Sequence, residues 1–437
     1  MSTPPAPASG PAPLLPWLLA WLVGLGVVFG FKARPAQTEL DVDEFYWIGS
    51  TYYYHLAFRS PDWRHPDWGL LPARENPPVA KYVLGAGLQL QGQPIATPDL
   101  LGTFYLIFQS TPHAWGEGEA YAKRLAVVER MRPDLRERLR AGAQLQLDRK
   151  LLQAGRRTVL VVMAAASLLA FLLGARLLHP LTGLLGSVLL GLHPTVAHSF
   201  NLAHSDIIAL AFSLAAAGTT QALARRLWPP GPLSIGRQWP LAVSTGVLVA
   251  LACGAKMNAL VVAVLAAVAL GAALARRIRH SPREAAAPAI LVLMSAAAAV
   301  AAFILINPTF LQDPGGGLAA VVQEHRATEL IQARFMRDHL TTVGAKFSAV
   351  AGLSVGSPFL LAAAGAAALG LLAFSRQEGV RFLAVWFLLG LVAVTFWIPF
   401  PIGRYVLPVV LPGTLLAGAI AGCALSALAR RLRRAGP

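Results

Sequence analysis

The sequence predicts an all-α polytopic membrane protein, on the basis of its composition, its apolar runs and the placement of its arginines. Of 437 residues, 56% are hydrophobic and 13% are charged, and the mean hydropathy is +0.56. This apolar share exceeds that of ordinary soluble domains, and too few charges remain to cover a globule. The composition excludes a soluble globular enzyme, a disordered chain and a disulfide-stapled secreted domain.

Ten apolar runs come near the length of about 20 helical residues that one bilayer crossing needs. In order, they are Leu14–Phe31, Val159–Leu178, Leu181–Phe200, Ile207–Leu223, Leu241–Cys253, Ala259–Ala275, Ala286–Ile306, Ala349–Phe374, Phe382–Ile398 and Val406–Leu428. The fifth run is the weakest because it is short. The first run lacks the form of a cleavable signal, since no basic stretch precedes it and no small-residue cleavage site follows it.

The arginines predict which loops face the cytoplasm. They collect in three linkers and in the C-terminal tail, at 225–237, 276–283, 376–381 and 430–434. Cytoplasmic loops carry an excess of Lys and Arg, so we expect these segments and both termini in the cytoplasm. The loops expected on the other side are 32–157, 201–206, 307–346 and 399–405. This topology accounts for the net charge of +16, and no nucleic-acid partner is expected.

The predicted topology divides the chain into five parts. They are an N-terminal tail with the first membrane helix (1–31), an extracytoplasmic loop (32–157), a transmembrane bundle (158–306), a second extracytoplasmic loop (307–346), and C-terminal transmembrane helices with a basic tail (347–437). In the first loop, Val79–Leu90 and Leu100–Phe108 are apolar but too short to cross, so we expect helices lying in the interface. The charged stretch Glu117–Arg157 is rich in helix formers and predicts an extramembrane helix.

The first loop carries two candidate motifs. Asp41-Val42-Asp43-Glu44 places like charges together near a bilayer, which would raise the pKa of at least one carboxyl and suit a general base or a metal ligand. Spacing alone favours a hydrated acidic loop instead. In Glu75-Asn76-Pro77-Pro78, the prolines end one element, so a helix begins at Val79. Lys81 would then lie in the first turn of this helix, where its ammonium would bind a phosphate. Taken alone, the residue favours the alternative that its side chain extends to the lipid headgroups.

Three further clusters lie at the outer ends of predicted spans. His204 and Asp206 would hold a metal or a water molecule, although the local pattern favours a simple helix cap at Ser205 or Asp206. Lys256 lies between two spans, where it would pair with an acid or a phosphate or extend outward. Arg404 would bind a phosphate through two N–H groups or, beside Tyr405, anchor the chain in the interface.

The order of these clusters resembles the GT-C superfamily of membrane glycosyltransferases, in particular the branch of the protein O-mannosyltransferases and lipid A aminoarabinose transferases. Asp43-Glu44 with Tyr46 is similar to the acidic pair of the family's first loop, and the Pro-Pro segment with Lys81-Tyr82 to its acidic/polar-x-Pro-Pro segment. The other similar segments are Asp206, Gly254-Ala255-Lys256, Asn307-Pro308, Asp313-Pro314 and Arg404-Tyr405-x-Leu407-Pro408-x-x-x-Pro412. The last of these is the most specific.

The resemblance implies a GT-C-like bundle of about 10–12 transmembrane helices with a long first extracytoplasmic loop that carries interfacial helices. The chain departs from the family in two respects. The segment 91–155 lengthens the first loop by roughly sixty residues, which points to an acceptor preference of its own. The ten apolar runs are also fewer than the family's eleven to thirteen spans. We expect no C-terminal soluble domain.

The resemblance also implies an activity: an inverting transfer of a hexosyl or pentosyl group from a polyprenyl-phosphate donor to a protein, lipid or glycan acceptor at the outer face of a bacterial inner membrane. Asp43 would be the general base and Glu44 the second catalytic carboxylate. The donor phosphate would be bound by Lys81, Lys256, Arg404 and Tyr405. The acceptor or a metal would be supported by Asp206, His204 and Glu75. A divalent cation at Asp43 and Asp206 is the one cofactor considered.

Two other functions stay open. A transporter or flippase for lipid-linked sugars predicts ionisable residues near the span midplanes or inverted repeats, whereas the predicted spans are nearly free of charge. A non-catalytic membrane subunit of a cell-envelope complex predicts no dependence on Asp43. The sugar, the acceptor, the metal dependence and the oligomeric state are not determined by these motifs.

Overall fold

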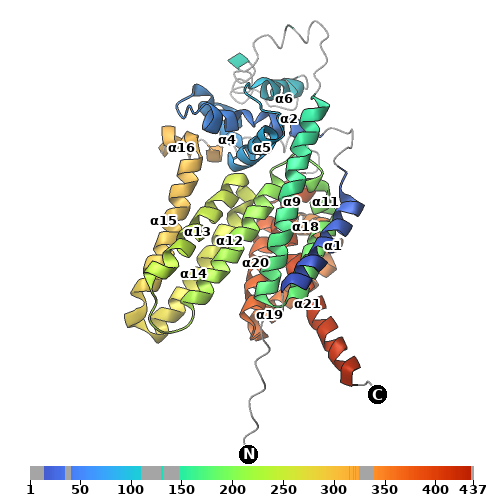
Figure 1. Cartoon of the computed structure of the whole chain (residues 1–437), viewed down its shortest axis with the longest axis vertical. Helices are drawn as coiled ribbons and strands as arrows, with labels where there is room; N and C mark the ends of the chain where they lie inside the picture. Colours follow the sequence, from blue (N-terminus) through green and yellow to red (C-terminus); the bar gives the residue numbers. More distant parts are fainter. Residues whose placement is uncertain are drawn as a thin grey trace, which may run out of the picture.

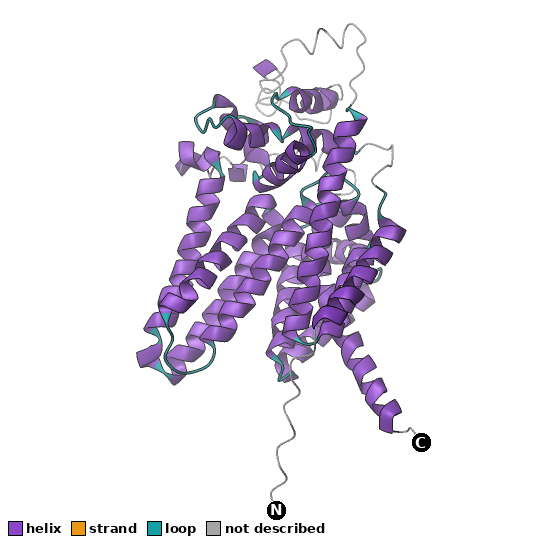
Figure 2. Cartoon of the chain, in the orientation of Figure 1, coloured by secondary structure: helices purple, strands orange, loops and turns teal. Residues whose placement is uncertain are grey.

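The computed structural model of the chain describes residues 14–34, 41–109, 129–130, 137, 147–313, 315–317, 319, 321–323 and 339–434. These residues form helices and connecting loops, with no strand among them (Figure 2). Long helices form a bundle, and short helices of the first loop cover one of its ends, called the capped end below (Figure 1). The predicted all-α fold is confirmed.

Within the described residues, eight helices are long and apolar enough to cross a membrane. They are α1 (Leu14–Lys32), α9 (Arg149–Leu177), α12 (Asp206–Leu227), α13 (Ile235–Ala255), α14 (Leu260–His280), α15 (Ala286–Ile306), α20 (Glu378–Trp397) and α21 (Leu407–Arg434). Each coincides with a predicted apolar run, and α15 has the predicted bounds. The short fifth run becomes a full span because α13 already begins at Ile235.

The two remaining runs are each broken by a bend. One forms α10 (Pro180–Leu192) and α11 (Pro194–Phe200), which meet at 69°, and the other forms α18 (Val343–Ser354) and α19 (Pro358–Phe374), which meet at 89°. In both pairs the second helix begins with a proline, which has no N–H to continue the first helix. The bundle has ten spans if each bent pair counts as one.

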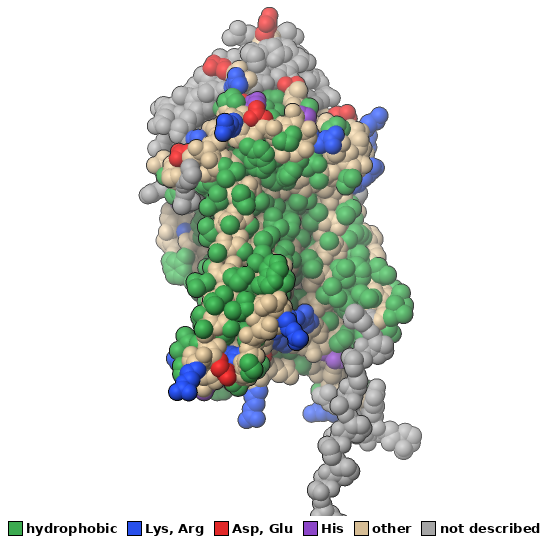
Figure 3. All heavy atoms as spheres, turned by 60° about the vertical axis from the view of Figure 1, so that its left-hand side comes forward, with side chains coloured by type: hydrophobic (Ala, Val, Ile, Leu, Met, Phe, Trp, Pro, Cys, Tyr) green, Lys and Arg blue, Asp and Glu red, His purple; other side chains and the backbone are tan. Residues whose placement is uncertain are grey.

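Small residues let the bundle helices approach one another closely, as is common where lipid surrounds a protein. α13 packs against α15 at Gly246, where an added Cβ would lie 2.1 Å from the carbonyl oxygen of Ser295. α10 packs against α21, where a Cβ on Gly418 would lie 2.6 Å from the nitrogen of Gly186. Apolar side chains cover the visible side of the bundle, and charged side chains gather towards its ends (Figure 3).

Seven short helices of the first loop build the cap. They are α2 (Val42–Gly49), α3 (Tyr52–Tyr54), η1 (His55–Arg59), η2 (Pro66–Gly69), α4 (Leu71–Glu75), α5 (Val79–Leu90) and α6 (Asp99–Gln109). α5 has the bounds predicted for it, and α6 extends one residue beyond its prediction at each end. Most of the helix predicted over Glu117–Arg157 lies outside the described residues, and its end, from Arg149 onward, belongs to α9.

The second loop also contributes to the cap. Its helix α16 (Pro308–Gln312) lies against η2, where the hydroxyl of Thr309 donates to the carbonyl of Trp68 at 3.2 Å. The remaining short helices are η3 (Met257–Ala259), η4 (Pro282–Glu284) and η5 (Gly403–Val406). The arginine-rich linkers α12–α13, α14–α15 and α19–α20 lie at the end of the bundle opposite the cap (Figure 1). The loops and linkers predicted on opposite sides of a membrane are therefore at opposite ends of the bundle.

Candidate functional site

The acidic motif lies at the start of α2 and is shaped by a capping box. The carboxylate of Asp41 accepts a hydrogen bond from the backbone N–H of Asp43 at 2.8 Å, and the carboxylate of Glu44 accepts one from the N–H of Asp41 at 3.2 Å. This reciprocal arrangement satisfies two N–H groups that a helix start leaves free. It leaves Asp43 partly exposed and turns Glu44 into the protein.

Asp43 pairs with an arginine from the far end of the sequence. Nη1 of Arg404, in η5, lies 2.5 Å from Oδ2 of Asp43, although the two residues are 361 positions apart. The side chain of Arg404 is 26% exposed and that of Asp43 is 29% exposed. The structure thus brings the predicted base and one predicted phosphate ligand together at a surface that a substrate can reach.

A second set of charges lies beside this pair, at the start of α12. The ammonium of Lys256 contacts Oδ1 of Asp206, the first residue of α12. Oδ2 of Asp206 lies 3.8 Å from Nδ1 of His204, and Nε2 of His204 lies 3.6 Å from Oδ1 of Asp41. His204 and Asp206 are both buried, so each charge must be matched by a close partner.

The carboxylates next to His204 govern its charge. Burial alone would lower its pKa, but the nearby carboxylates of Asp206 and Asp41 outweigh burial and raise the pKa of His204 to about 9. In turn, the interaction with His204 lowers the pKa of Asp41 to about 2, against the opposing effect of burial. The cluster thus sets three acidic side chains, Asp41, Asp43 and Asp206, against three basic ones, His204, Lys256 and Arg404.

Glu44 has a different environment from Asp43. It is completely buried, and Arg156 of α9 binds it through two bonds, from Nε to Oε1 at 2.8 Å and from Nη2 to Oε2 at 2.6 Å. The backbone N–H of Ala203 also donates to Oε1, at 2.9 Å. The carboxylate of Glu44 is thus enclosed by protein donors.

Lys81 is also buried, within the cap. Its ammonium donates to the carbonyl of Asn76 at 2.8 Å and to that of Pro72, and it lies 5.1 Å from the ring centre of Tyr53 and 5.9 Å from that of Tyr46. These contacts fix the turn that carries Pro77-Pro78. A lipid phosphate would reach Lys81 only if this turn opened, and phosphate binding by Lys81 stays a prediction.

Two other predicted residues complete the set. Tyr405 follows Arg404 in η5 and is half-buried, which places it next to the Asp43–Arg404 pair in the chain. Glu75 ends α4, but its side chain lies outside the part of the chain that the structure describes. The roles predicted for both stay predictions.

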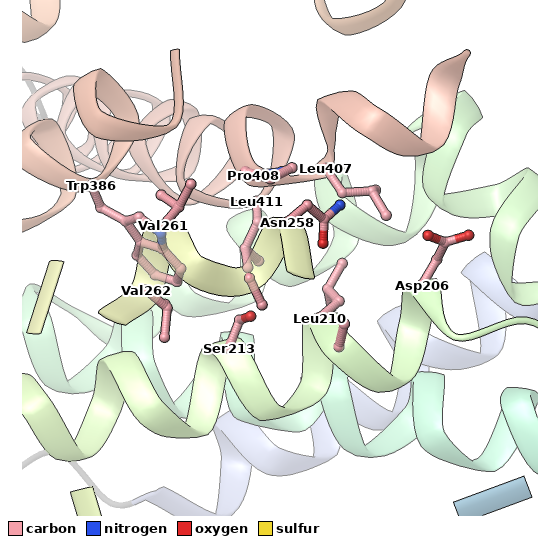
Figure 4. Close-up of a pocket in the computed structure, with 12 residues that line it drawn as sticks. Asp206, Leu210, Ser213, Asn258, Val261, Val262, Trp386, Leu407, Pro408 and Leu411 are labelled. Carbon is pink, nitrogen blue, oxygen red and sulfur yellow. The ribbon is translucent and has the colours of Figure 1, made fainter. Parts of the chain in front are cut away.

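A narrow cavity extends from Asp206 into the bundle (Figure 4). It has a volume of about 30 Å³, room for one or two water molecules. Figure 4 shows Asp206 at one end and Trp386 at the other, with Asn258 and Ser213 between them. The remaining lining is apolar and comes from α12, α14 and α21, with Ala259 of η3. The cavity joins the charged cluster to the apolar interior.

Three of the side chains fit a divalent cation. Donor atoms of Asp41, Asp43 and His204 all lie within 4.8 Å of one another. Nε2 of His204 is buried and has no hydrogen-bond partner among the described residues, so it would serve as a nitrogen ligand once His204 loses its proton to the incoming cation. This group contains Asp43, predicted as a metal ligand, and His204, predicted as a metal-supporting residue. It has Asp41 in place of the predicted ligand Asp206, which pairs with Lys256.

Sequence reasoning missed two residues of this region. Asp41 belongs to the acidic motif but was assigned no role, although the spacing Asp41-x-x-Glu44 is that of a capping box. Arg156 was placed in the loop because it precedes the apolar run of α9. The presence of two arginines, Arg156 and Arg157, at a membrane boundary was a weak signal that one of them points inward.

No family model and no curated protein sequence matches the chain. Among solved structures, it is similar to ArnT from Cupriavidus metallidurans bound to undecaprenyl phosphate, with 14% identity and a TM-score of 0.51 over 93% of this chain and 59% of that one. It is also similar to the archaeal oligosaccharyltransferase AglB from Archaeoglobus fulgidus in complex with an inhibitory peptide and a dolichol-phosphate, with 13% identity and a TM-score of 0.50 over 96% of this chain and 52% of that one.

The chain spans only between half and three fifths of the length of these two structures. At this level of identity the similarity concerns the fold. The chain shares the fold of both structures, so the predicted architecture, a bundle of membrane helices with a long first loop at one end, is confirmed.

Proposed function

We propose that this protein is an inverting membrane glycosyltransferase that moves a sugar from a polyprenyl-phosphate donor to an acceptor hydroxyl at the capped end. The observation that carries the proposal is the partly exposed Asp43–Arg404 pair, which places a carboxylate base next to a guanidinium suited to phosphate. The fold adds support, because one similar structure is bound to undecaprenyl phosphate and the other to a dolichol-phosphate.

In the proposed reaction, Asp43 accepts the proton of the acceptor hydroxyl. The acceptor oxygen forms a bond to the anomeric carbon while the bond from that carbon to the phosphate oxygen breaks, and the electron pair leaves with the lipid phosphate. One displacement inverts the configuration at the anomeric carbon. Asp43 suits this role because about a quarter of its side chain is open to solvent, whereas Glu44 is enclosed.

The cations stabilise the leaving group. Loss of the sugar adds negative charge to the lipid phosphate, so cations aimed at it lower the barrier. Arg404 lies in η5 and Lys256 in the link between α13 and η3. Both reach the charged cluster, and each is paired with a carboxylate that the phosphate would share. Lys81 and Tyr405 keep their predicted roles as further phosphate ligands.

If the enzyme uses a divalent cation, Asp41, Asp43 and His204 would hold it. Such an ion would supply positive charge that favours ionisation of a bound hydroxyl. Asp206, which the sequence predicted as acceptor or metal support, would instead orient Lys256 and His204.

We further propose that the capped end faces the outside of a bacterial inner membrane, with both termini in the cytoplasm. The arginine-rich linkers at the opposite end of the bundle support this orientation. A nucleotide-sugar is absent on that outer side, which fits a donor linked to a membrane lipid.

The distribution of buried charge argues against a transporter or flippase. Among the described residues, the buried charged side chains at the capped end are Glu44, Asp67, Lys81, Arg156, His204 and Asp206, and Arg277 is at the opposite end. A transporter would place such groups near the midplane of the spans. A non-catalytic subunit remains the rival to be excluded by experiment.

The proposal is tested by incubating the purified protein in nanodiscs with a panel of polyprenyl-phosphate sugars, with and without a chelator. We expect one donor to be consumed and Asp43→Asn to lower the rate by about 10²- to 10⁴-fold, the range for a lost general base. Asp62→Asn changes an exposed carboxylate of the same loop and serves as the control. Full activity of a folded Asp43→Asn protein would contradict the proposal.

A further inference from the structure

The most deeply buried ion pair of the capped end lies behind the proposed base. The side chains of Arg156 and Glu44 are 1% and 0% exposed. Removing two charges from water is unfavourable, and an apolar pair of similar volume is often as stable. Stability alone therefore does not explain why an arginine and a glutamate occupy these positions.

The geometry shows what the pair connects. The carboxylate of Glu44 accepts two bonds from Arg156 of α9, one from the N–H of Ala203 at 2.9 Å and one from the N–H of Asp41 at 3.2 Å. The donors come from three segments: α9, the loop before α12 and the start of α2. One buried carboxylate thus fastens three segments that are far apart in the sequence.

A second observation places the same three segments in direct contact. Gly155, next to Arg156, packs so closely that an added Cβ would lie 3.0 Å from Cβ of Ala203 and 3.3 Å from Cδ1 of Ile48 in α2. A methyl group here would need its neighbours to move by a few tenths of an ångström, so this close approach is a contact separate from the ion pair.

Glu44 and Ala203, which this network joins, are next in sequence to two residues of the site. Asp43 precedes Glu44, and His204 follows Ala203. Any shift of Glu44 relative to Ala203 would therefore change the separation between the proposed base and the histidine that faces Asp41. Neither Arg156 nor Glu44 is exposed to a substrate.

We infer that Arg156 is a positioning residue for sugar transfer: acting through Glu44, it holds Asp43 and His204 in register with each other. The inference rests on the proposed function. It also changes the role of Glu44, which the sequence predicted to be catalytic, to that of the link between Arg156 and the site. Catalytic groups displaced by about 1 Å lose about 10²-fold in rate, so the effect of breaking the link should be large.

The test compares single and double variants of the pair. Glu44→Gln and Arg156→Gln each leave one buried charge unpaired, whereas the double variant removes both charges and keeps groups that hydrogen-bond to each other. We expect each single variant to lose about 10²-fold in kcat with little change in the KM for the donor, and the double variant to regain a large part of that loss. Arg156→Lys keeps the charge without the two-pronged geometry and should fall between wild type and Arg156→Gln.

A control and a measurement independent of turnover make the test decisive. Arg277→Gln breaks a buried arginine pair at the opposite end, and it should leave kcat unchanged. Hydrogen exchange of the amides of 41–49 and 201–206 should speed up in Arg156→Gln and not in Arg277→Gln.

The possible outcomes separate the two proposals. If Arg156→Gln is as active as wild type, or if exchange in both segments is unchanged, the positioning role is overturned. If the double variant is no better than Glu44→Gln while Arg156→Gln alone is nearly normal, Glu44 acts on the substrate directly and the inference is wrong. If wild type consumes no donor, the proposed function fails, and the exchange result still decides whether Arg156 orders the two segments.

Discussion

Each end of the bundle holds a buried arginine, and the two arginines are used differently. At the capped end, Arg156 binds both oxygens of the fully buried Glu44. At the opposite end, Arg277 donates to the backbone carbonyls of Leu227 at 2.8 Å and Gly231 at 2.7 Å, and to a Glu284 whose side chain is 40% exposed. Arg277 caps the C-terminal end of α12, which ends at Leu227; basic side chains often bind the last carbonyls of a helix in this way.

The difference concerns how much each end depends on matched charges. At the opposite end the carboxylate of Glu284 can be solvated if its partner is lost. At the capped end Asp206 and Glu44 have no such alternative, because both are buried. A protein keeps such a cluster where the positions of the charges matter for its activity.

The largest expected contrast in stability comes from Lys256→Met. It leaves Asp206 buried without its cation, and breaking a buried pair in this way costs about 3–5 kcal/mol. Arg277→Met should cost less, since Glu284 is partly exposed. The free energy of unfolding in mixed micelles measures both. Equal losses would show that the two ends tolerate unpaired charge alike.

The next effect is on catalysis. Arg404→Ala removes a donor aimed at the proposed leaving group, and we expect kcat/KM to fall by about 10²- to 10³-fold, the loss seen for single transition-state donors. Arg237→Ala removes an exposed arginine at the opposite end and should have no effect. Steady-state kinetics with varied donor concentration give kcat/KM for both variants. A value for Arg404→Ala equal to that of Arg237→Ala would show that Arg404 is not part of the site.

A pH titration isolates His204. Its pKa in the folded protein is raised to about 9 from the ordinary value of 6.5, so protonated His204 stabilises the fold fully below pH 6.5. That contribution declines as the pH rises through 9. The free energy of unfolding, measured against pH with a chelator present, should fall through this range in wild type and not in His204→Asn. Parallel curves for the two proteins would rule out a charged His204.

The smallest contrast comes from two glycines. In Gly155→Ala the new methyl group would crowd Ala203 and Ile48, at an expected cost of about 1–3 kcal/mol. Gly236→Ala, at the opposite end, meets only Oγ of Ser234 at 3.9 Å and should be neutral or stabilise the helix by up to about 1 kcal/mol. The midpoint temperatures of thermal unfolding of the two variants, compared with wild type, test both expectations. A Gly155→Ala protein as stable as wild type would mean that the packing at this point is loose.

Local signals predicted the elements of the fold well. The helix Val79–Leu90 has its predicted bounds because Pro77-Pro78 define its start and Gly92, with φ of +69°, follows its end. Ala286–Ile306 was equally clear, since every residue in it is apolar or small. Each of these signals involves residues close together in the chain, so the sequence of this protein is enough to detect it.

Contacts over long sequence separations could not be predicted in the same way. Lys81 taken alone favours the headgroups, and the family resemblance implies phosphate binding, but in the structure its ammonium packs against the rings of Tyr46 and Tyr53. Nothing near Arg156 in the sequence shows that it is buried, because its partner Glu44 is 112 positions away. Burial of a charged side chain depends on which distant segment supplies the opposite charge, and periodicity carries no information about that choice.

The pairing of Asp43 with Arg404 has a consequence for how the protein is made. The two residues are 361 positions apart, and Arg404 begins the last described span. During synthesis at the ribosome, the first carboxylates therefore emerge long before the guanidinium that complements them. A nascent chain released before its last helix enters the bilayer would lack the guanidinium of the pair, and under the proposed mechanism it would transfer no sugar.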